Sequence, residues 1–123
     1  MAAVVEEAAY GDLPLLLRRK IPEFVRFGGM LEPAILLAGK LFPDFDYKEV
    51  VPKREAAMLS DEGVPLFIIH SADDEVVPYE QAKILTASYP EASAWTLEGY
   101  RHVEAYEHPE YAHRLRGFLD ANR

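Results

Sequence analysis

The segment that follows Gly63 constrains the fold more than any other part of this sequence. Residues 64–70 (VPLFIIH) form a continuous apolar run, which is typical of a strand buried on both faces of a parallel sheet. A predicted helix over 78–89, a short strand over 94–97 and a final helix over 107–121 follow. The order strand–helix–strand–helix predicts parallel strands joined by right-handed crossovers, and therefore an α/β fold.

The first 60 residues follow a different pattern. Residues 2–8 are a short apolar run with an acidic pair and predict a strand. From 12 to 60 the apolar residues recur at helical spacing, but Pro22 and the pair Gly28-Gly29 interrupt it. We expect this segment to be a helical cover rather than part of the sheet. Its expected helices are two short ones separated near Pro22, a third over 33–41 and a fourth over 52–60.

Length and composition fit one globular domain. The chain has 123 residues, of which 50% are hydrophobic and 28% charged, so we treat 1–123 as a single domain that buries a core. Its 21 acidic and 13 basic residues give a net charge of −8 at pH 7. This excess of acid argues against a nucleic-acid partner, because no basic stripe is available to neutralise phosphates. The absence of cysteine excludes a disulfide framework, thiolate metal ligands and a cysteine nucleophile.

No segment of the sequence has the ~18 consecutive apolar residues that a transmembrane helix requires. The most apolar run, over 30–42, is interrupted by Glu32, Pro33 and Lys40. The N-terminal residues MAAVVEE also lack the basic region and the long apolar region of a signal peptide. We therefore expect a cytoplasmic protein without a membrane partner.

Two loops bring polar side chains to the same edge of the predicted sheet. Asp74 lies four residues after His70, beyond one buried strand, and His102 lies four residues after Glu98, beyond the next. Adjacent parallel strands lie ~4.8 Å apart, and their carboxyl ends form the ligand-binding edge of an open sheet. An Asp held against a His is the part of a Ser-His-Asp triad that fixes the imidazole tautomer. A surface ion pair, or an Asp that caps the helix beginning near Pro78, would explain the same spacing.

Two sequence runs resemble the last third of α/β-hydrolase-fold serine hydrolases, in particular the esterase- and peptidase-like members with a helical cap. These runs are VPLFIIHSADDEVVPYEQA and WTLEGYRHVEAYEHPEYAHRLRGFL, within residues 64–119. In that family the triad acid lies in a Gly-x-x-Asp-x-x-Val-Pro loop and the base in a Gly-x-x-His-Val loop. The resemblance places Asp74 at the acid and His102 at the base, with Ser71 where the family usually has Gly. It also implies that residues 12–60 are a cap-like segment.

The family's nucleophile is absent from these 123 residues. No Gly-x-Ser-x-Gly motif is present, and no serine lies in such a strand-to-helix turn. The serines are Ser60, Ser71, Ser88 and Ser93. The resemblance therefore implies the C-terminal part of a larger hydrolase, with about three parallel strands and flanking helices, or one piece of a split enzyme. We expect such a chain to be inactive alone, because the acid and base of a triad do little without the nucleophile.

By this resemblance the complete enzyme would cleave a carboxylic ester or a related acyl bond of a small-molecule substrate, without a cofactor. The missing serine would attack, His102 would carry the proton, and Asp74 would orient His102. The chain's partner would be the N-terminal half of the hydrolase, or a second copy joined at the open edge of the strand over 2–8. The alternative is a non-catalytic α/β module that binds a partner or acts as a subunit.

Several other residues near the two loops allow more than one interpretation. Asp73 is an alternative acid, although the Val-Pro spacing favours Asp74. His70 fits a packed, hydrogen-bonded histidine at the end of a buried strand. A metal site made of these three residues and His102 is a further alternative, but no His-x-x-x-His spacing supports it.

The remaining candidates fit plain structural roles as well as functional ones. The apolar residues of the helical cover either line an acyl pocket or pack in a core, and the sequence does not separate the two: Leu16, Leu17, Phe24, Phe27, Met30 and Leu31. The basic residues there indicate a solvated helix face: Arg18, Arg19, Lys20 and Arg26. His108 and His113 are expected on the surface of the last helix. Trp95 and Tyr100 are expected to anchor the core and a loop.

Overall fold

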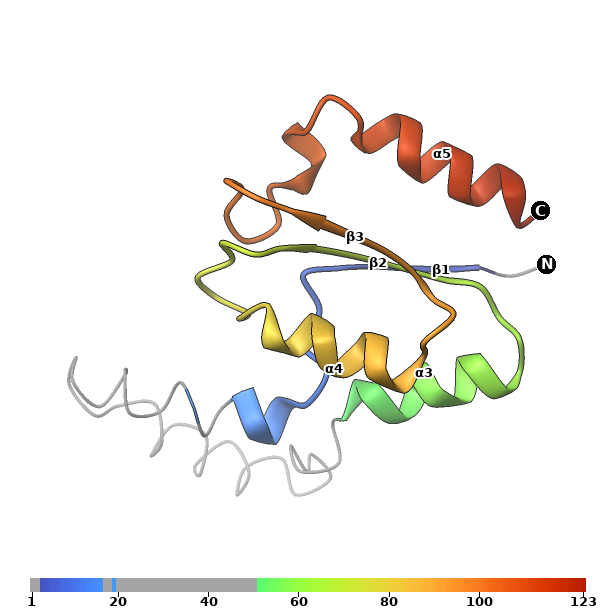
Figure 1. Cartoon of the computed structure of the whole chain (residues 1–123), viewed down its shortest axis with the longest axis horizontal. Helices are drawn as coiled ribbons and strands as arrows, with labels where there is room; N and C mark the ends of the chain where they lie inside the picture. Colours follow the sequence, from blue (N-terminus) through green and yellow to red (C-terminus); the bar gives the residue numbers. More distant parts are fainter. Residues whose placement is uncertain (1–2, 17–18, 20–50) are drawn as a thin grey trace, which may run out of the picture. The chain divides into compact units, whose positions relative to one another are not determined.

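A parallel sheet of three strands is the frame of the computed structural model (Figure 1). The structure describes residues 3–16, 19 and 51–123. The strands, in their order across the sheet, are β1 (Val4–Glu7), β2 (Leu66–Ser71) and β3 (Ser93–Leu97). Both pairs of neighbours run parallel. The three strands that the sequence predicts are therefore present, and their parallel arrangement is confirmed.

Strand β2 takes the central place because it is apolar on both faces. All of its residues are buried, and Leu66 and Ile69 retain only 1% exposure. Successive side chains of a strand point to opposite faces, so Leu66 joins one hydrophobic cluster and Phe67 the other. A strand that fills two clusters requires a layer of helices on each side.

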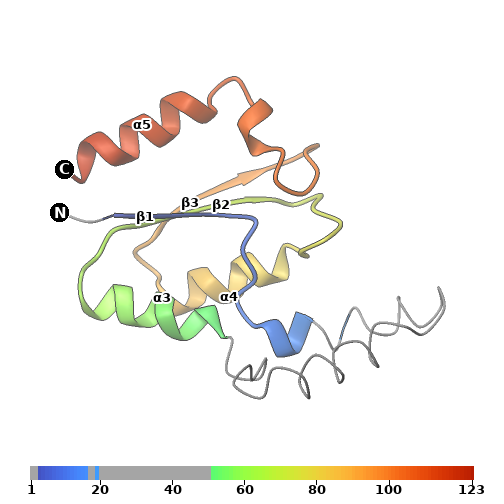
Figure 2. The same ribbon diagram turned by 180° about the vertical axis from the view of Figure 1, so that it is seen from behind.

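Helices α3 (Pro52–Asp61) and α4 (Glu80–Ser88) cover one face of the sheet (Figures 1 and 2). Ala56 of α3 and Leu85 of α4 join Ile68 of β2 in one buried cluster. Both helices occur where the sequence predicts them, with small shifts at their ends.

Helix α5 (Tyr111–Ala121) covers the opposite face, together with the short 3₁₀ helix η1 (Ala105–Glu107) (Figures 1 and 2). The ring of Phe118 lies 5.2 Å, centroid to centroid, from the ring of Phe67 on β2. Tyr100 and Trp95 pack against the same cluster, which confirms them as core and loop anchors. The sheet is thus enclosed between two helical layers.

The last helix begins later than the sequence predicts, at Tyr111 instead of residue 107. His108 is extended, with φ −69° and ψ 132°, because the residue before a proline, here Pro109, is biased away from the helical conformation. His108 therefore precedes α5 and packs edge-on against Trp95, with ring centroids 4.9 Å apart. Its expected place on the surface of the last helix is wrong.

The chain divides into two compact units, Met1–Gly11 with Pro52–Arg123 and Asp12–Val51. Helix α3 belongs to the first of them, whereas the sequence assigns residues 52–60 to the cap-like segment. Helix α3 belongs to the sheet unit because its Ala56 is 3% exposed and lies in the core of that unit.

A small part of the second unit is among the described residues. Residues 13–16 are helical, and the carboxylate of Asp12 caps them by accepting the Leu15 N–H at 3.0 Å. The helices expected near Pro22 and over 33–41 lie outside the described residues. So do the candidates Leu17, Arg18, Lys20, Phe24, Arg26, Phe27, Met30 and Leu31. In the described part of the chain, no helix has the length and apolar character to cross a membrane.

Candidate functional site

The loops that follow β2 and β3 are joined to each other by hydrogen bonds. The backbone N–H of Ala72 donates to the carbonyl of Leu97 at 2.8 Å, at the point where both strands end. The hydroxyl of Ser71 donates to the carbonyl of Tyr100. Because β2 and β3 are parallel neighbours, both loops lie at the carboxyl edge of the sheet, as the sequence predicts.

The carboxylate of Asp74 is buried, and both of its oxygens accept hydrogen bonds. Its side chain is 1% exposed. Oδ1 accepts the backbone N–H groups of Val76 and Val77, each at 2.8 Å. Oδ2 accepts Nδ1–H of His102 at 2.8 Å. Two backbone donors on one oxygen fix the plane of the carboxylate, so the other oxygen is held in place for the imidazole.

The imidazole of His102 is oriented by this bond and by the turn that carries it. Its side chain is 31% exposed. The turn is closed by the Arg101 N–H, which donates to the carboxylate of Glu104 at 2.9 Å. Val103 has φ of 56°, a left-handed conformation that is unusual for a β-branched residue. With Nδ1–H directed at Asp74, Nε2 is the ring nitrogen that is left to accept a proton.

The structure separates the two acidic residues that the sequence leaves as alternatives. Asp73 is exposed, and its carboxylate accepts the backbone N–H of Gly99 at 2.6 Å, which ties the two loops together. Gly99 has φ of 78°, a conformation that favours glycine. Asp74, not Asp73, therefore carries the bond to His102.

His70 lies beneath the Asp74 loop and is 2% exposed. Its Nε2 donates to the carbonyl of Val77 at 2.8 Å and lies 3.7 Å from Oδ2 of Asp74. The expectation of a packed, hydrogen-bonded histidine is therefore confirmed. In the described part of the chain, no group of three or more His, Cys, Asp or Glu residues is arranged to hold a metal ion.

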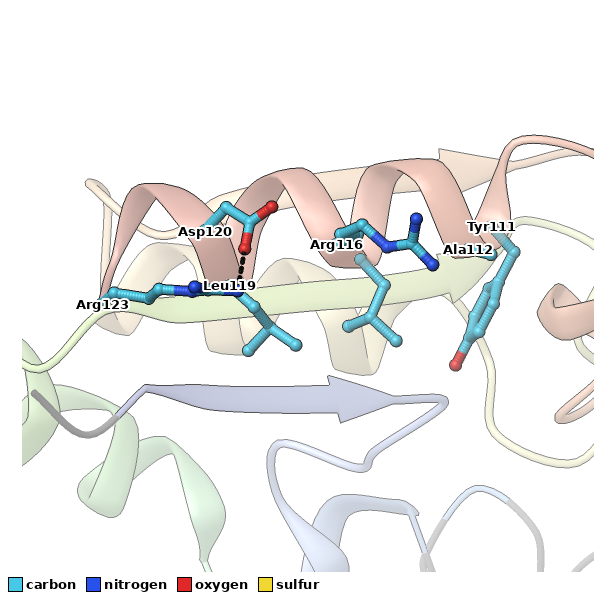
Figure 3. Close-up of a pocket in the computed structure, with 7 residues that line it drawn as sticks. Tyr111, Ala112, Arg116, Leu119, Asp120 and Arg123 are labelled. Atoms are coloured by element: carbon cyan, nitrogen blue, oxygen red, sulfur yellow. Dashed lines mark ion pairs between the residues drawn. The ribbon is translucent and has the colours of Figure 1, made fainter.

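The described residues line a small cavity at the carboxyl edge of the sheet and a groove along α5. A small cavity of about 10 Å³ lies beside Asp74 and is also lined by Glu7, His70 and Arg101. A larger groove of about 350 Å³ runs along α5, where Tyr111 and Leu119 extend toward the side of β1 (Figure 3). The larger groove is lined by neither Asp74 nor His102, and of the two residues only Asp74 lines the smaller cavity.

Two features of this edge are missing from the sequence prediction. The Ser71 hydroxyl links the two loops, although the sequence marks it only as a departure from glycine. Tyr111, on α5, donates its hydroxyl to the carboxylate of Glu7 at 3.0 Å, and Glu7 lines the small cavity. Nothing in the spacing of Glu7 and Tyr111, which come from opposite ends of the chain, signals this contact.

Comparison with known proteins finds similarity in structure only. No protein-family model and no curated protein matches the sequence. A puromycin hydrolase variant in complex with PGG is 17% identical with a TM-score of 0.58, and the match covers 94% of this chain and 17% of that one. BpoC of Mycobacterium tuberculosis H37Rv, described as a candidate non-heme bromoperoxidase, is 13% identical with a TM-score of 0.60, and the match covers 100% and 59%.

A third similar structure is MGS-MChE2, an α/β-hydrolase enzyme from the metagenome of lagoon sediments of Mar Chica, Morocco. It is 20% identical with a TM-score of 0.57, and the match covers 98% of this chain and 51% of that one. The chain thus spans between 17% and 59% of the length of these three structures. Together with the three parallel strands and their flanking helices, these matches show that the chain has part of an α/β-hydrolase fold.

Proposed function

We propose that this chain carries the general base and the orienting acid of a serine hydrolase that cleaves a carboxylic ester or a related acyl bond. The observation that supports this most is the 2.8 Å contact between Nδ1 of His102 and Oδ2 of the buried Asp74. The contact lies at the carboxyl edge of a parallel sheet, which is where open α/β folds bind ligands.

In this proposal the protons move through His102. Asp74 accepts Nδ1–H, so the lone pair of Nε2 is available to take the proton of a serine hydroxyl as the oxygen attacks the acyl carbon. The buried carboxylate then stabilises the imidazolium without being protonated itself. Nε2–H returns the proton to the leaving alcohol, and a water molecule repeats the cycle to release the acid.

The attacking serine is proposed to come from outside these 123 residues. None of the four serines of the sequence lies in a Gly-x-Ser-x-Gly motif, and Ser71 donates its hydroxyl to the carbonyl of Tyr100. In the described part of the chain, β1 pairs with β2 alone, so its outer edge is available to a strand that carries the nucleophile.

The names of the similar structures support hydrolysis and leave the substrate open. Two of the three are described as hydrolases and one as a candidate bromoperoxidase. We therefore propose only the class of substrate, a small molecule with an ester or related acyl bond, and no particular compound.

The test is to express the chain together with the coding segment that precedes it and to measure hydrolysis of p-nitrophenyl butyrate. We expect activity in the joined protein and a loss of at least ~10³-fold in kcat for His102→Ala. His113→Ala is the matched control, because His113 is exposed on α5 as predicted. Wild-type turnover in the His102→Ala protein would refute the proposal.

The second candidate is a non-catalytic α/β module, and the absence of Gly-x-Ser-x-Gly from the 123 residues favours it. A fluorophosphonate probe distinguishes the two once the preceding segment is joined, since only an enzyme with an activated serine reacts. Under either candidate the 123-residue chain alone should remain unlabelled, and stoichiometric labelling of it would contradict both.

A further inference from the structure

We infer that His70 is a positioning residue, which holds the Asp74 carboxylate in the orientation that His102 requires. This inference rests on the proposed function, in which Asp74 orients the catalytic base. It concerns a buried titratable side chain that the proton transfers themselves do not use.

The hydrogen bonds connect His70 to Asp74 through one residue. Nε2 of His70 lies 2.8 Å from the carbonyl of Val77, and a carbonyl only accepts, so the proton of His70 is on Nε2. The N–H of the same Val77 donates to Oδ1 of Asp74 at 2.8 Å. Val77 is therefore held at its carbonyl by the histidine and at its amide by the carboxylate.

The same ring also faces the second oxygen of the carboxylate. Nε2 of His70 is 3.7 Å from Oδ2 of Asp74, the oxygen that accepts the proton of His102. This distance is too long for a hydrogen bond, but it places the positive end of an N–H dipole beside the negative charge. Asp74 is thus bounded by backbone donors on one oxygen and by two imidazoles near the other.

Packing holds the His70 ring in this orientation. The residue is 2% exposed, and the ring of Tyr79 lies 6.1 Å from it, centroid to centroid. Within the described residues, Nδ1 of His70 is buried without a hydrogen-bond partner. A side chain needed only to fill this space would be apolar, since a buried polar atom without a partner costs free energy. The polar contribution that offsets this cost is the Nε2–H directed at Val77.

The test uses the 123-residue chain itself, labelled with ¹⁵N-histidine, and measures by NMR the chemical shift of the hydrogen-bonded Nδ1–H of His102 and the rate at which this proton exchanges with solvent. His70→Gln retains a terminal N–H donor, whereas His70→Leu has none. We expect His70→Leu to weaken the Nδ1–H resonance, to shift it upfield and to speed its exchange with solvent, because a misplaced carboxylate accepts this proton in a poorer geometry. His70→Gln should restore most of the wild-type behaviour, and His113→Leu should change neither quantity.

A purely structural role predicts a different result. His70→Leu would then lower the melting temperature and leave the resonance and the solvent exchange of the His102 Nδ1–H unchanged, which would overturn the inference. If the leucine variant does not fold, His70→Asn replaces it, because the asparagine amide is too short to reach the Val77 carbonyl. Identical Nδ1–H resonances of His102 in the Gln and Asn variants would overturn the inference equally. The readout requires no turnover, so a failure of ester hydrolysis in the joined protein is a separate outcome.

Discussion

Nδ1 of His102 and Oδ2 of Asp74 lie 2.8 Å apart, although 28 positions separate the two residues in the chain. They come from loops that follow neighbouring parallel strands, and hydrogen bonds between those loops fix their heights above the sheet. The carboxylate is 1% exposed and the imidazole 31% exposed, which is the arrangement that the proposed roles of an orienting acid and a base require.

Asp74→Asn tests this division of roles. The amide retains an oxygen for the N–H groups of Val76 and Val77, so we expect a stability loss within ~1 kcal/mol. Its NH₂ group cannot accept Nδ1–H of His102, which favours the wrong tautomer, and kcat of the joined hydrolase should fall by ~10⁴-fold. Urea denaturation measures the first effect and ester hydrolysis the second.

Asp74→Ala leaves the N–H groups of Val76 and Val77 unpaired, so its free energy of unfolding should fall by at least ~2 kcal/mol. A smaller loss of stability than that of the Asn variant would contradict this account.

The raised pKa of Glu6 leads to a prediction of how the free energy of unfolding depends on pH. Burial raises the pKa of its carboxyl above the ordinary 4.5, and the nearby Glu55 raises it further. The folded state therefore holds this proton more tightly than the unfolded state, so stability is fully present below pH 4.5 and is lost as the pH rises through the raised value. We expect Glu6→Gln to raise the melting temperature at pH 7 and to leave it nearly unchanged at pH 4.

The control for this experiment is Glu91→Gln, which removes a charge at an exposed position. Glu55→Gln should give a smaller gain than Glu6→Gln at pH 7, since Glu55 contributes the lesser cause. Parallel profiles of melting temperature against pH for wild type and Glu6→Gln would show that Glu6 does not titrate in this way.

The contact between Tyr111 and Glu7 joins α5 to β1. The Tyr111 hydroxyl donates to one oxygen of Glu7 at 3.0 Å, and the other oxygen is buried without a partner within the described residues. Tyr111→Phe should therefore cost ~1–2 kcal/mol, because it leaves the buried carboxylate without this donor. The double change Glu7→Leu with Tyr111→Phe should recover part of that loss. Urea denaturation of the four proteins in a double-mutant cycle gives the coupling, and additive losses would disprove it.

The same contact affects stability at alkaline pH. Burial raises the pKa of the Tyr111 hydroxyl above its ordinary value of 10.0, and the hydrogen bond to Glu7 raises it further. The folded state keeps the proton longer than the unfolded state, so stability should fall as the pH rises above 10. The Tyr111→Phe protein should lose less stability than the wild type as the pH rises above 10.

The outer edge of β1 is proposed as the surface that receives a second strand. The N–H groups of Val4 and Ala8 donate toward the β2 side, so alternation directs the N–H of Val5 to the outer edge. Val5→Pro removes that donor and leaves the pairing with β2 intact. We expect the 123-residue chain to self-associate at high concentration and Val5→Pro to do so less, as measured by sedimentation velocity. A wild-type chain that sediments as a monomer throughout would count against this use of the edge.

Much of the sheet and of the site could be predicted because the signals are local or periodic. The continuous apolar run over 64–70 requires a strand buried on both faces, and β2 is that strand. The four-residue offsets of Asp74 and His102 from their strands placed both side chains at one edge. Parallel pairing of the two strands was the remaining assumption, and it is confirmed.

Other features could not be predicted, because they depend on contacts between distant segments. The late start of α5 has a local signal, since Pro109 biases the preceding His108 toward the extended conformation, but the packing of His108 on Trp95 has none. The place of α3 in the sheet unit follows from the burial of Ala56, which an amphipathic pattern does not assign to a particular core.

Local patterns are enough to predict the α/β class, the order of the strands along the chain and the two loops that carry polar residues, since apolar periodicity and turn residues act over a few positions. The Val-Pro spacing favours Asp74 over Asp73, but the contact of its carboxylate with the imidazole exists only in the folded chain. Asp73 and Asp74 are adjacent and chemically identical, and they differ only in direction. The turn points one carboxylate at the backbone N–H of Gly99 and buries the other against His102 and the amides of Val76 and Val77.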